Sequence, residues 1–231
     1  MRSGDVVAEA WGTYKEHWRH LLPIAFVVYV LISLLALLLA ALLGWAGVVI
    51  GALISLAGVF WLQGALVVAI EDVRDGRADL SIGDTLGRLR PRLNTLTIAG
   101  LLAATAIMIG LLLLLVPGLV LLTFWLLIVP VIVIERAGVF DSFGRSFRLV
   151  RGHAWSVFGV LVLTVLIVIA VGFVLAMVSA ALDNILLDLV LDIGSQTVTA
   201  PFVALAWTMT YYRLRSLEET PAVEPVPEYG P

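Results

Sequence analysis

The chain has 231 residues, of which 61% are hydrophobic and 13% charged, and it contains no cysteine. Soluble domains have about a quarter of their residues charged, so this composition excludes an ordinary soluble domain and indicates a membrane protein. The absence of cysteine excludes disulfide frameworks, thiolate catalysis and thiolate metal sites. The net charge of −3 hides a strong segregation of charge along the chain, which predicts the topology.

Long uncharged stretches predict the spans. Residues 21–70 are long enough for two crossings of a hydrocarbon core about 30 Å thick, with Gly44 and Gly47 as the natural place to turn. Residues 93–134 are interrupted by the turn-forming dipeptide Pro117-Gly118. Two further uncharged stretches follow. The sequence therefore predicts six spans, at residues 21–43, 47–70, 95–115, 119–135, 155–181 and 193–213.

The basic residues predict the orientation of these spans. All fourteen lysines and arginines lie before the first span, between the second and third, between the fourth and fifth, or after the sixth. Six spans place these groups on one side of the membrane, opposite two short turns and the acidic segment 183–192. The positive-inside rule then predicts that both termini lie in the cytoplasm. Residues 1–20 carry too many charges for a cleavable signal peptide.

A short pattern precedes each predicted pair of spans. It reads DVVAEAW from Asp5, DTLGRLR from Asp84 and DSFGRSF from Asp141. Apolar residues recur at spacings of three and four, which places them on one helical face. These apolar positions are Val7, Trp11, Tyr14, Leu86, Leu89, Leu93, Phe143, Phe147 and Val150.

Three repeated units follow from this pattern. We expect amphipathic helices in the membrane plane at residues 4–19, 82–92 and 139–151, each followed by a transmembrane hairpin. The predicted fold is all-α and polytopic, with one membrane domain over residues 1–215. The tail 216–231 is rich in glutamate and proline and is predicted to be disordered.

Arginines on the polar faces of the second and third in-plane helices are candidates for binding anionic lipid headgroups. They are Arg88, Arg90, Arg92, Arg145, Arg148 and Arg151. A basic residue near an anionic lipid surface contributes on the order of 1 kcal/mol to membrane binding. The sequence leaves open whether these helices bind lipid or only fix the topology and tilt of the spans.

Glu135 ends the predicted fourth span, where a carboxylate without a partner is energetically costly. Arg136 is adjacent in sequence but points elsewhere on a helix. We therefore predict a structural ion pair between Glu135 and Arg145, Arg148 or Arg151. The alternative is that Glu135 and these arginines together form a headgroup site.

Small residues predict close helix packing. Gly47 and Gly51 in the second span, and Gly172 in the fifth, begin runs of small residues at four-residue spacing. Such a face packs either inside the bundle or against a second copy of the chain. Pro130 removes a backbone N–H from the fourth span and is expected to bend it.

No catalytic or metal-binding constellation is evident. The predicted span interiors contain no ionisable residue, which disfavours an ion-coupled transporter but leaves a path for a neutral solute open. His17 and His20 are three residues apart, but only one further histidine exists and a suitably placed carboxylate is missing. The acidic segment 183–192 lacks the spacing of a calcium loop. We predict no cofactor, no metal and no nucleic-acid partner.

The third unit resembles a known family. Residues 130–155, PVIVIERAGVFDSFGRSFRLVRGHAW, combine a proline in a span, a glutamate at its end, then serine, arginine and Gly-x-x-Trp. This pattern is similar to the membrane domain of glycerophosphoryl diester phosphodiesterases and its stand-alone relatives, a bacterial and archaeal family, and the resemblance extends over residues 4–216. The resemblance implies a multi-pass protein of a prokaryotic cell (inner) membrane. In multidomain relatives a catalytic barrel follows, and such a barrel needs roughly 250 residues. The resemblance therefore implies a membrane module without that enzyme activity.

These observations predict a non-enzymatic membrane scaffold or lipid-binding module. Its partners would be membrane lipids, anionic at the cytoplasmic face, together with a second copy or another membrane protein. The alternative is a transporter or channel for a neutral or lipid-derived solute. The absence of charge inside the spans and the three basic in-plane helices favour the first interpretation.

Overall fold

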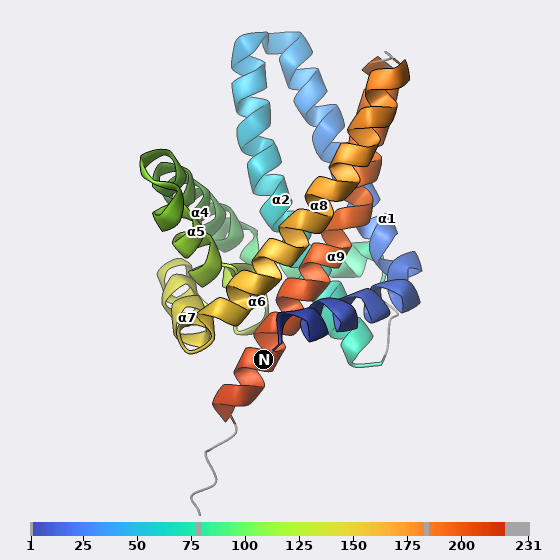
Figure 1. Ribbon diagram of the computed structural model, residues 1–231. Helices are drawn as coiled ribbons and strands as arrows, with labels where there is room; N and C mark the ends of the chain where they lie inside the picture. The colour runs from blue at the N-terminus through green and yellow to red at the C-terminus, as the bar shows by residue number, and fades with distance from the viewer. Residues whose placement is uncertain (1, 77–79, 183–184, 220–231) are drawn as a thin grey trace, which may run out of the picture.

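The computed structural model describes residues 2–76, 80–182 and 185–219, which are almost entirely helical and contain no strand (Figure 1). This confirms the predicted all-α class. The helices are α1 (Ser3–Leu43), α2 (Trp45–Arg74), α3 (Ile82–Leu89), the 3-10 turn η1 (Arg90–Arg92), α4 (Leu93–Leu113), α5 (Leu115–Phe124), α6 (Ile128–Ile134), α7 (Val139–Arg151), α8 (Ala154–Leu182) and α9 (Ile185–Glu219).

Six segments of the described chain are long and apolar enough to cross a membrane. They are Ser3–Leu43, Trp45–Arg74, Ile82–Leu113, Leu115–Ile134, Ala154–Ser179 and Leu189–Glu219. The predicted number of apolar segments is therefore confirmed. The first four residues of the predicted disordered tail belong to α9, and residues 220–231 lie outside the described residues.

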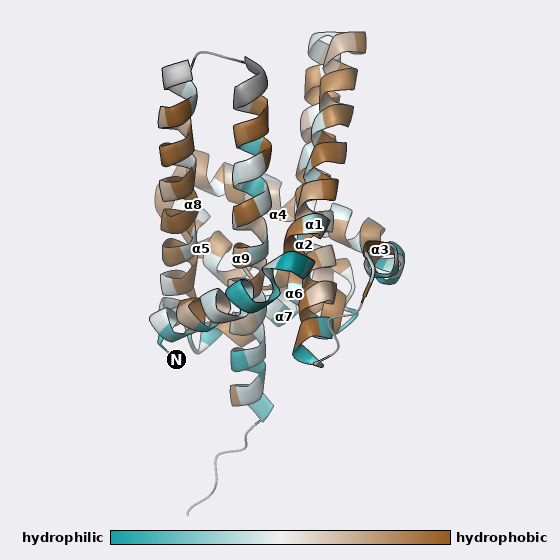
Figure 2. Ribbon diagram, turned by 90° about the vertical axis from the view of Figure 1, so that its right-hand side faces the viewer, coloured by the Kyte–Doolittle hydropathy of each residue, from teal (hydrophilic) through white to brown (hydrophobic). Residues whose placement is uncertain are grey.

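The packed core lies at one end of the bundle. Residues 64–70 of α2, 128–133 of α6 and 200–206 of α9 are all buried. This end also carries α3, α7 and the arginine-bearing end of α9, and we call it the basic face. Figure 2 shows that the opposite halves of α1, α2 and α8 are mainly hydrophobic. Many of their side chains are exposed, as expected for helices that face lipid.

The hairpin of α1 and α2 turns at Gly44, whose φ of 58° favours glycine. Gly47 lies inside α2, where an added Cβ would overlap the carbonyl of Leu39. Gly51 also lies close to α1: a Cβ added at Gly51 would be 3.3 Å from the Cβ of Ala36. This small-residue face therefore packs inside the chain, against α1.

The predicted in-plane helix 4–19 and the predicted span 21–43 form one continuous helix, α1, which bends between them. α1 bends at His17, which has φ −117° and ψ 15°. Pro23 lacks the N–H that would bond the Arg19 carbonyl, and this weakens the helix close to the bend. Before the bend, α1 lies across α9 (Figure 1), and the Ser3 hydroxyl donates to the carbonyl of Ser156 in α8 at 2.9 Å.

The turn between α4 and α5 was predicted at Pro117-Gly118 but lies at Leu114, which is extended, with φ −157° and ψ 131°. Pro117 is the third residue of α5. At that position a helix does not use the backbone N–H, so proline costs no hydrogen bond. Gly118 packs closely against Gly110 of α4, with 3.0 Å from an ideal Gly110 Cβ to the Gly118 Cα. The dipeptide therefore begins a helix and does not end one.

The predicted span 119–135 is broken between α5 and α6. Pro130 cannot bond the carbonyl of Leu126, and the interruption falls at that point. The amide of Ile128 instead donates to the Trp125 carbonyl at 3.3 Å. The expected bend is thus a full interruption of the helix.

The first part of α1, α3 and α7 pack against the bundle through positions next to the predicted apolar faces. The side chains one and five positions after each repeated Asp are at most 1% exposed: Val6, Ala10, Thr85, Leu89, Ser142 and Ser146. Of the predicted apolar positions, Trp11, Leu86 and Phe147 are exposed, whereas Tyr14, Leu89 and Val150 are buried. In α7 the small Ser146 side chain allows close approach to α5, because its hydroxyl donates to the Phe124 carbonyl.

The predicted outer acidic loop is largely helical. Residues 185–192 form the first turns of α9. Asp192 accepts a hydrogen bond from Gln196 at 2.7 Å, one helical turn later. Asp183 and Asn184 lie outside the described residues.

Candidate functional site

Glu135 and Arg145 lie in direct contact. Glu135 caps the end of α6, and the Arg145 Nε in α7 donates to both of its carboxylate oxygens at 3.0 and 2.9 Å. The Tyr211 hydroxyl of α9 donates to the same carboxylate at 2.9 Å. Arg136 has φ 59°, so the chain turns sharply after Glu135. The carboxylate thus receives hydrogen bonds from two further helices.

Arg145 also pairs with Glu218 near the end of α9, at 2.8 Å. Burial opposes the charge of the guanidinium, but the hydrogen bonds and ion pairs with both glutamates outweigh it and raise the pKa of Arg145 above its ordinary value. Arg148 and Arg151 are exposed, and within the described part of the chain neither forms an ion pair. Of the three predicted partners of Glu135, Arg145 is the one that forms the ion pair.

The arginines around α3 also divide into two kinds. Arg92 donates to the carbonyls of Ile132 and Val133, among the last carbonyls of α6. These carbonyls have no partner inside their own helix, so Arg92 caps α6. Arg88 and Arg90 are exposed to the surroundings. The structure therefore leaves four of the six predicted headgroup residues exposed: Arg88, Arg90, Arg148 and Arg151.

An apolar groove of about 510 Å³, which we call the α3 groove, opens between α1, α2 and α3. Leu31 and Leu35 of α1 form one wall and Leu86 of α3 another, and Arg90 lies at the edge. Trp61 of α2 completes the lining, and its Nε1 donates to the Thr97 hydroxyl at 2.8 Å. The groove combines a hydrocarbon-like lining with one exposed cation.

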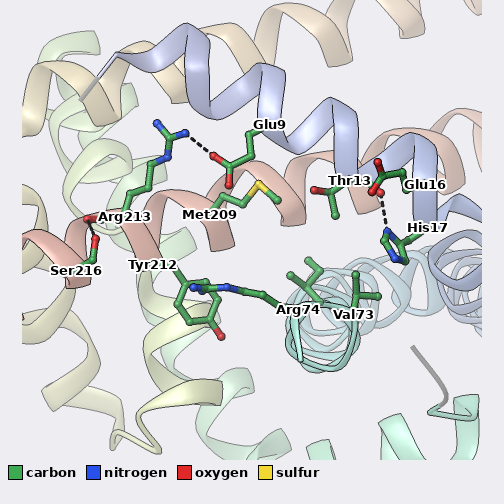
Figure 3. A pocket seen from close by; sticks show the side chains of 11 residues that line it. Glu9, Thr13, Glu16, His17, Val73, Arg74, Met209, Tyr212, Arg213 and Ser216 are labelled. Atoms are coloured by element: carbon green, nitrogen blue, oxygen red, sulfur yellow. Dashed lines mark hydrogen bonds and ion pairs between the residues drawn. The ribbon is translucent and has the colours of Figure 1, made fainter. Parts of the chain in front are cut away.

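A polar cavity of about 350 Å³ lies between the first part of α1 and the ends of α2 and α9 (Figure 3). Glu9 of α1 forms an ion pair with Arg213 of α9 across it. The Arg74 guanidinium of α2 stacks on the ring of Tyr212, 3.6 Å from its centroid. Glu16 also lines the cavity. Charges of both signs therefore face the same space.

Sequence reasoning missed this cavity. Glu9 and Arg213 are 204 residues apart, so no local pattern joins them. The sequence showed only that both residues are charged and lie near the ends of predicted spans. His17 lines the cavity, but its ring contacts the Thr13 carbonyl at 3.2 Å. Among the described residues no group of three or more histidine or acidic side chains is placed to hold a metal.

Two adjacent tyrosines of α9 reach two different helix ends. Tyr211 bonds Glu135 at the end of α6, and the Tyr212 ring stacks under the Arg74 guanidinium at the end of α2. Tyr211 is fully buried. The pair therefore ties α9 to both α2 and α6 at the basic face.

Comparisons with protein-family models, curated proteins and solved structures find no match to this chain. The resemblance to the phosphodiesterase membrane domains rests on the quoted residues and stays a prediction.

Proposed function

We propose that the protein is a non-enzymatic membrane module that binds anionic phospholipid in the cytoplasmic leaflet, with an acyl chain in the α3 groove and the headgroup at Arg88 and Arg90. The observation that carries the proposal is the joining of an apolar groove to an exposed arginine at its edge. A phospholipid is built in the matching way, with an apolar acyl chain joined to a charged headgroup.

The placement in the membrane belongs to the same proposal. The first part of α1, α3 and α7 lie in the membrane plane on the cytoplasmic side, where the positive-inside rule expects the arginines. The exposed Trp11, Leu86 and Phe147 then face the interfacial lipid. The burial of matching positions after Asp5, Asp84 and Asp141 supports three repeated units, each continuing into a hairpin.

Charge, and not the groove, should decide which lipid binds. An acyl chain gains little by leaving one hydrocarbon environment for another, because lipid tails are as apolar as leucine. Each arginine near an anionic headgroup contributes on the order of 1 kcal/mol. Two arginines then give a preference of roughly thirtyfold for anionic over zwitterionic lipid.

Native mass spectrometry of the purified protein with equal amounts of phosphatidylglycerol and phosphatidylcholine tests this proposal. We expect the wild type to retain phosphatidylglycerol, and the variant Arg88→Gln/Arg90→Gln to lose most of the preference. The matched control is Arg2→Gln/Lys15→Gln, which removes the same charge at Arg2, just before α1, and at Lys15 in the first part of α1. Equal retention of both lipids by the wild type, or equal losses in both variants, would refute the proposed site.

A second candidate function is the binding and transport of a small lipid-derived solute in the polar cavity. The cavity is lined by charges of both signs, with Glu9 paired to Arg213 and the Arg74 guanidinium stacked on Tyr212. The resemblance to glycerophosphodiesterase membrane domains suggests glycerophosphocholine as the probe. Its accumulation in proteoliposomes, with loss of uptake in Arg74→Gln, would favour this function over the first.

A further inference from the structure

The turn between α4 and α5 stands well below the far ends of the other long helices. Both views show it: the top of the α4–α5 hairpin lies far below the α1–α2 turn in Figure 1, and α4 and α5 end lower than α8 and α2 in Figure 2. We infer that this hairpin is re-entrant: it enters the membrane from the basic face, turns near the bilayer midplane and returns. The chain then crosses the whole membrane four times and contacts one leaflet with this hairpin.

Helix lengths measured from the surface helices support this depth. Gly64 of α2 faces Leu89 of α3, where an ideal Cβ would lie 2.8 Å from the Leu89 side chain. From the turn at Gly44 to this level α2 rises about 30 Å, the thickness of a hydrocarbon core. α2 is therefore long enough for a complete crossing above α3.

The ten residues of α5 give half that value, whereas the 21 residues of α4 that lead into the same turn are long enough for about 30 Å. The two helices meet at Leu114, so the shorter one limits the height of the turn and α4 must be strongly tilted. The Phe124 carbonyl at the end of α5 accepts a hydrogen bond from Ser146 of α7 at 2.6 Å. From that level to the turn at Leu114 the ten residues of α5 rise at most about 15 Å. This step rests on the proposed placement of α3 and α7 at one membrane surface. The turn then reaches the middle of the core.

The chemistry of the turn fits hydrocarbon. Residues 111–116 are all apolar, and Leu112 and Leu114 are 80% and 68% exposed. The α1–α2 turn differs, because Trp45 beside it is 82% exposed and tryptophan favours the membrane interface. The α4–α5 turn has no such anchor.

Two backbone positions reduce the number of free donors at the turn. An unbonded N–H or carbonyl costs several kcal/mol in lipid. The Leu114 amide donates to the Gly110 carbonyl at 3.0 Å, and Pro117, in the first turn of α5, has no N–H to satisfy. The remaining end groups of α4 and α5 need water or another partner at this depth.

The partner of this surface is the acyl chain of a lipid in the same leaflet. An apolar groove of about 240 Å³ follows α5 and α8 from Trp155, close to the end of α7, to Val116 beside the turn. Its polar group, the Thr123 hydroxyl, is already bonded to the Leu119 carbonyl at 2.8 Å. A groove confined to this depth matches one acyl chain that ends at the midplane.

Single-cysteine labelling measures the depth, because the natural chain has no cysteine. Leu114→Cys and Leu112→Cys report on the turn, and Trp45→Cys on the α1–α2 turn serves as the control. Each variant is spin-labelled and reconstituted in phosphatidylcholine and phosphatidylglycerol vesicles. Accessibility to oxygen and to a water-soluble nickel chelate then gives depth, independently of the orientation of the protein in the vesicle.

We expect labels at 112 and 114 to be accessible to oxygen, protected from nickel and about 15 Å below the headgroups. The label at 45 should be accessible to nickel. Nickel accessibility at 112 and 114 equal to that at 45 would overturn the inference. Two positions in the turn are labelled so that the depth can still be measured if one of the two variants does not fold. If the turn lies deep in the membrane but the protein shows no preference for anionic lipid, the proposed function is refuted while the inference of a re-entrant hairpin stands.

Discussion

Glu135→Gln provides the sharpest test of what holds the basic face together. The substitution keeps the shape of the side chain but removes the charge that Arg145 contacts at 2.9 Å. Hydrogen bonds to charged groups contribute about 1.5–3 kcal/mol each to folding. The two side chains are 21% and 22% exposed, so solvent screens part of this energy, and glutamine still accepts from Tyr211. We expect a loss of about 1–2 kcal/mol in the free energy of unfolding.

The assay is equilibrium unfolding in mixed detergent, supported by the thermal midpoint and the yield of folded protein. Glu218→Gln is the matched control, because Glu218 pairs with the same arginine but its side chain is 47% exposed. Its loss should stay below about 1 kcal/mol. Unchanged stability and yield in Glu135→Gln, or equal losses in both variants, would show that the contact with Arg145 does not stabilise the fold.

Three further substitutions test the packing and the helix ends. Gly47→Ala places a Cβ on a carbonyl of α1 and should cost about 1–3 kcal/mol in detergent unfolding, whereas Gly172→Ala meets open space and should be neutral. Arg92→Gln removes the charged cap from α6, and we expect a loss of about 1 kcal/mol in the free energy of unfolding. A thermal midpoint equal to that of the wild type would contradict the capping role. Ser146→Ala leaves the Phe124 carbonyl without its donor and should cost about 1–2 kcal/mol, measured in the same way.

Local signals in the sequence were enough to place α7. Gly138 and Gly152 bound it, Asp141 lies in its first turn, and the observed helix Val139–Arg151 has the predicted limits 139–151. The break between α5 and α6 was not predicted in full. Hydropathy measures composition and treats a broken helix and a straight one alike. The place of the break also depends on Ser146, which reaches across 22 residues to α5.

The candidate site was predictable only as a set of charges. Arg92 and Arg145 look like their neighbours in the sequence, yet the structure commits both to glutamate or carbonyl partners. The α3 groove was not predicted, because it depends on side chains from three helices meeting. The polar cavity was missed for the same reason, since its walls come from both ends of the chain.

The adjacent tyrosines of α9 have a consequence for biosynthesis. Ribosomes complete the chain from the N-terminus, so α2 and α6 enter the membrane before Tyr211 and Tyr212 have been made. Until then Glu135 lacks the hydroxyl group of Tyr211, and Arg74 at the end of α2 lacks the ring on which it stacks. The last helix therefore completes the basic face, and a nascent chain released before residue 211 would leave Glu135 bonded to Arg145 but not to Tyr211.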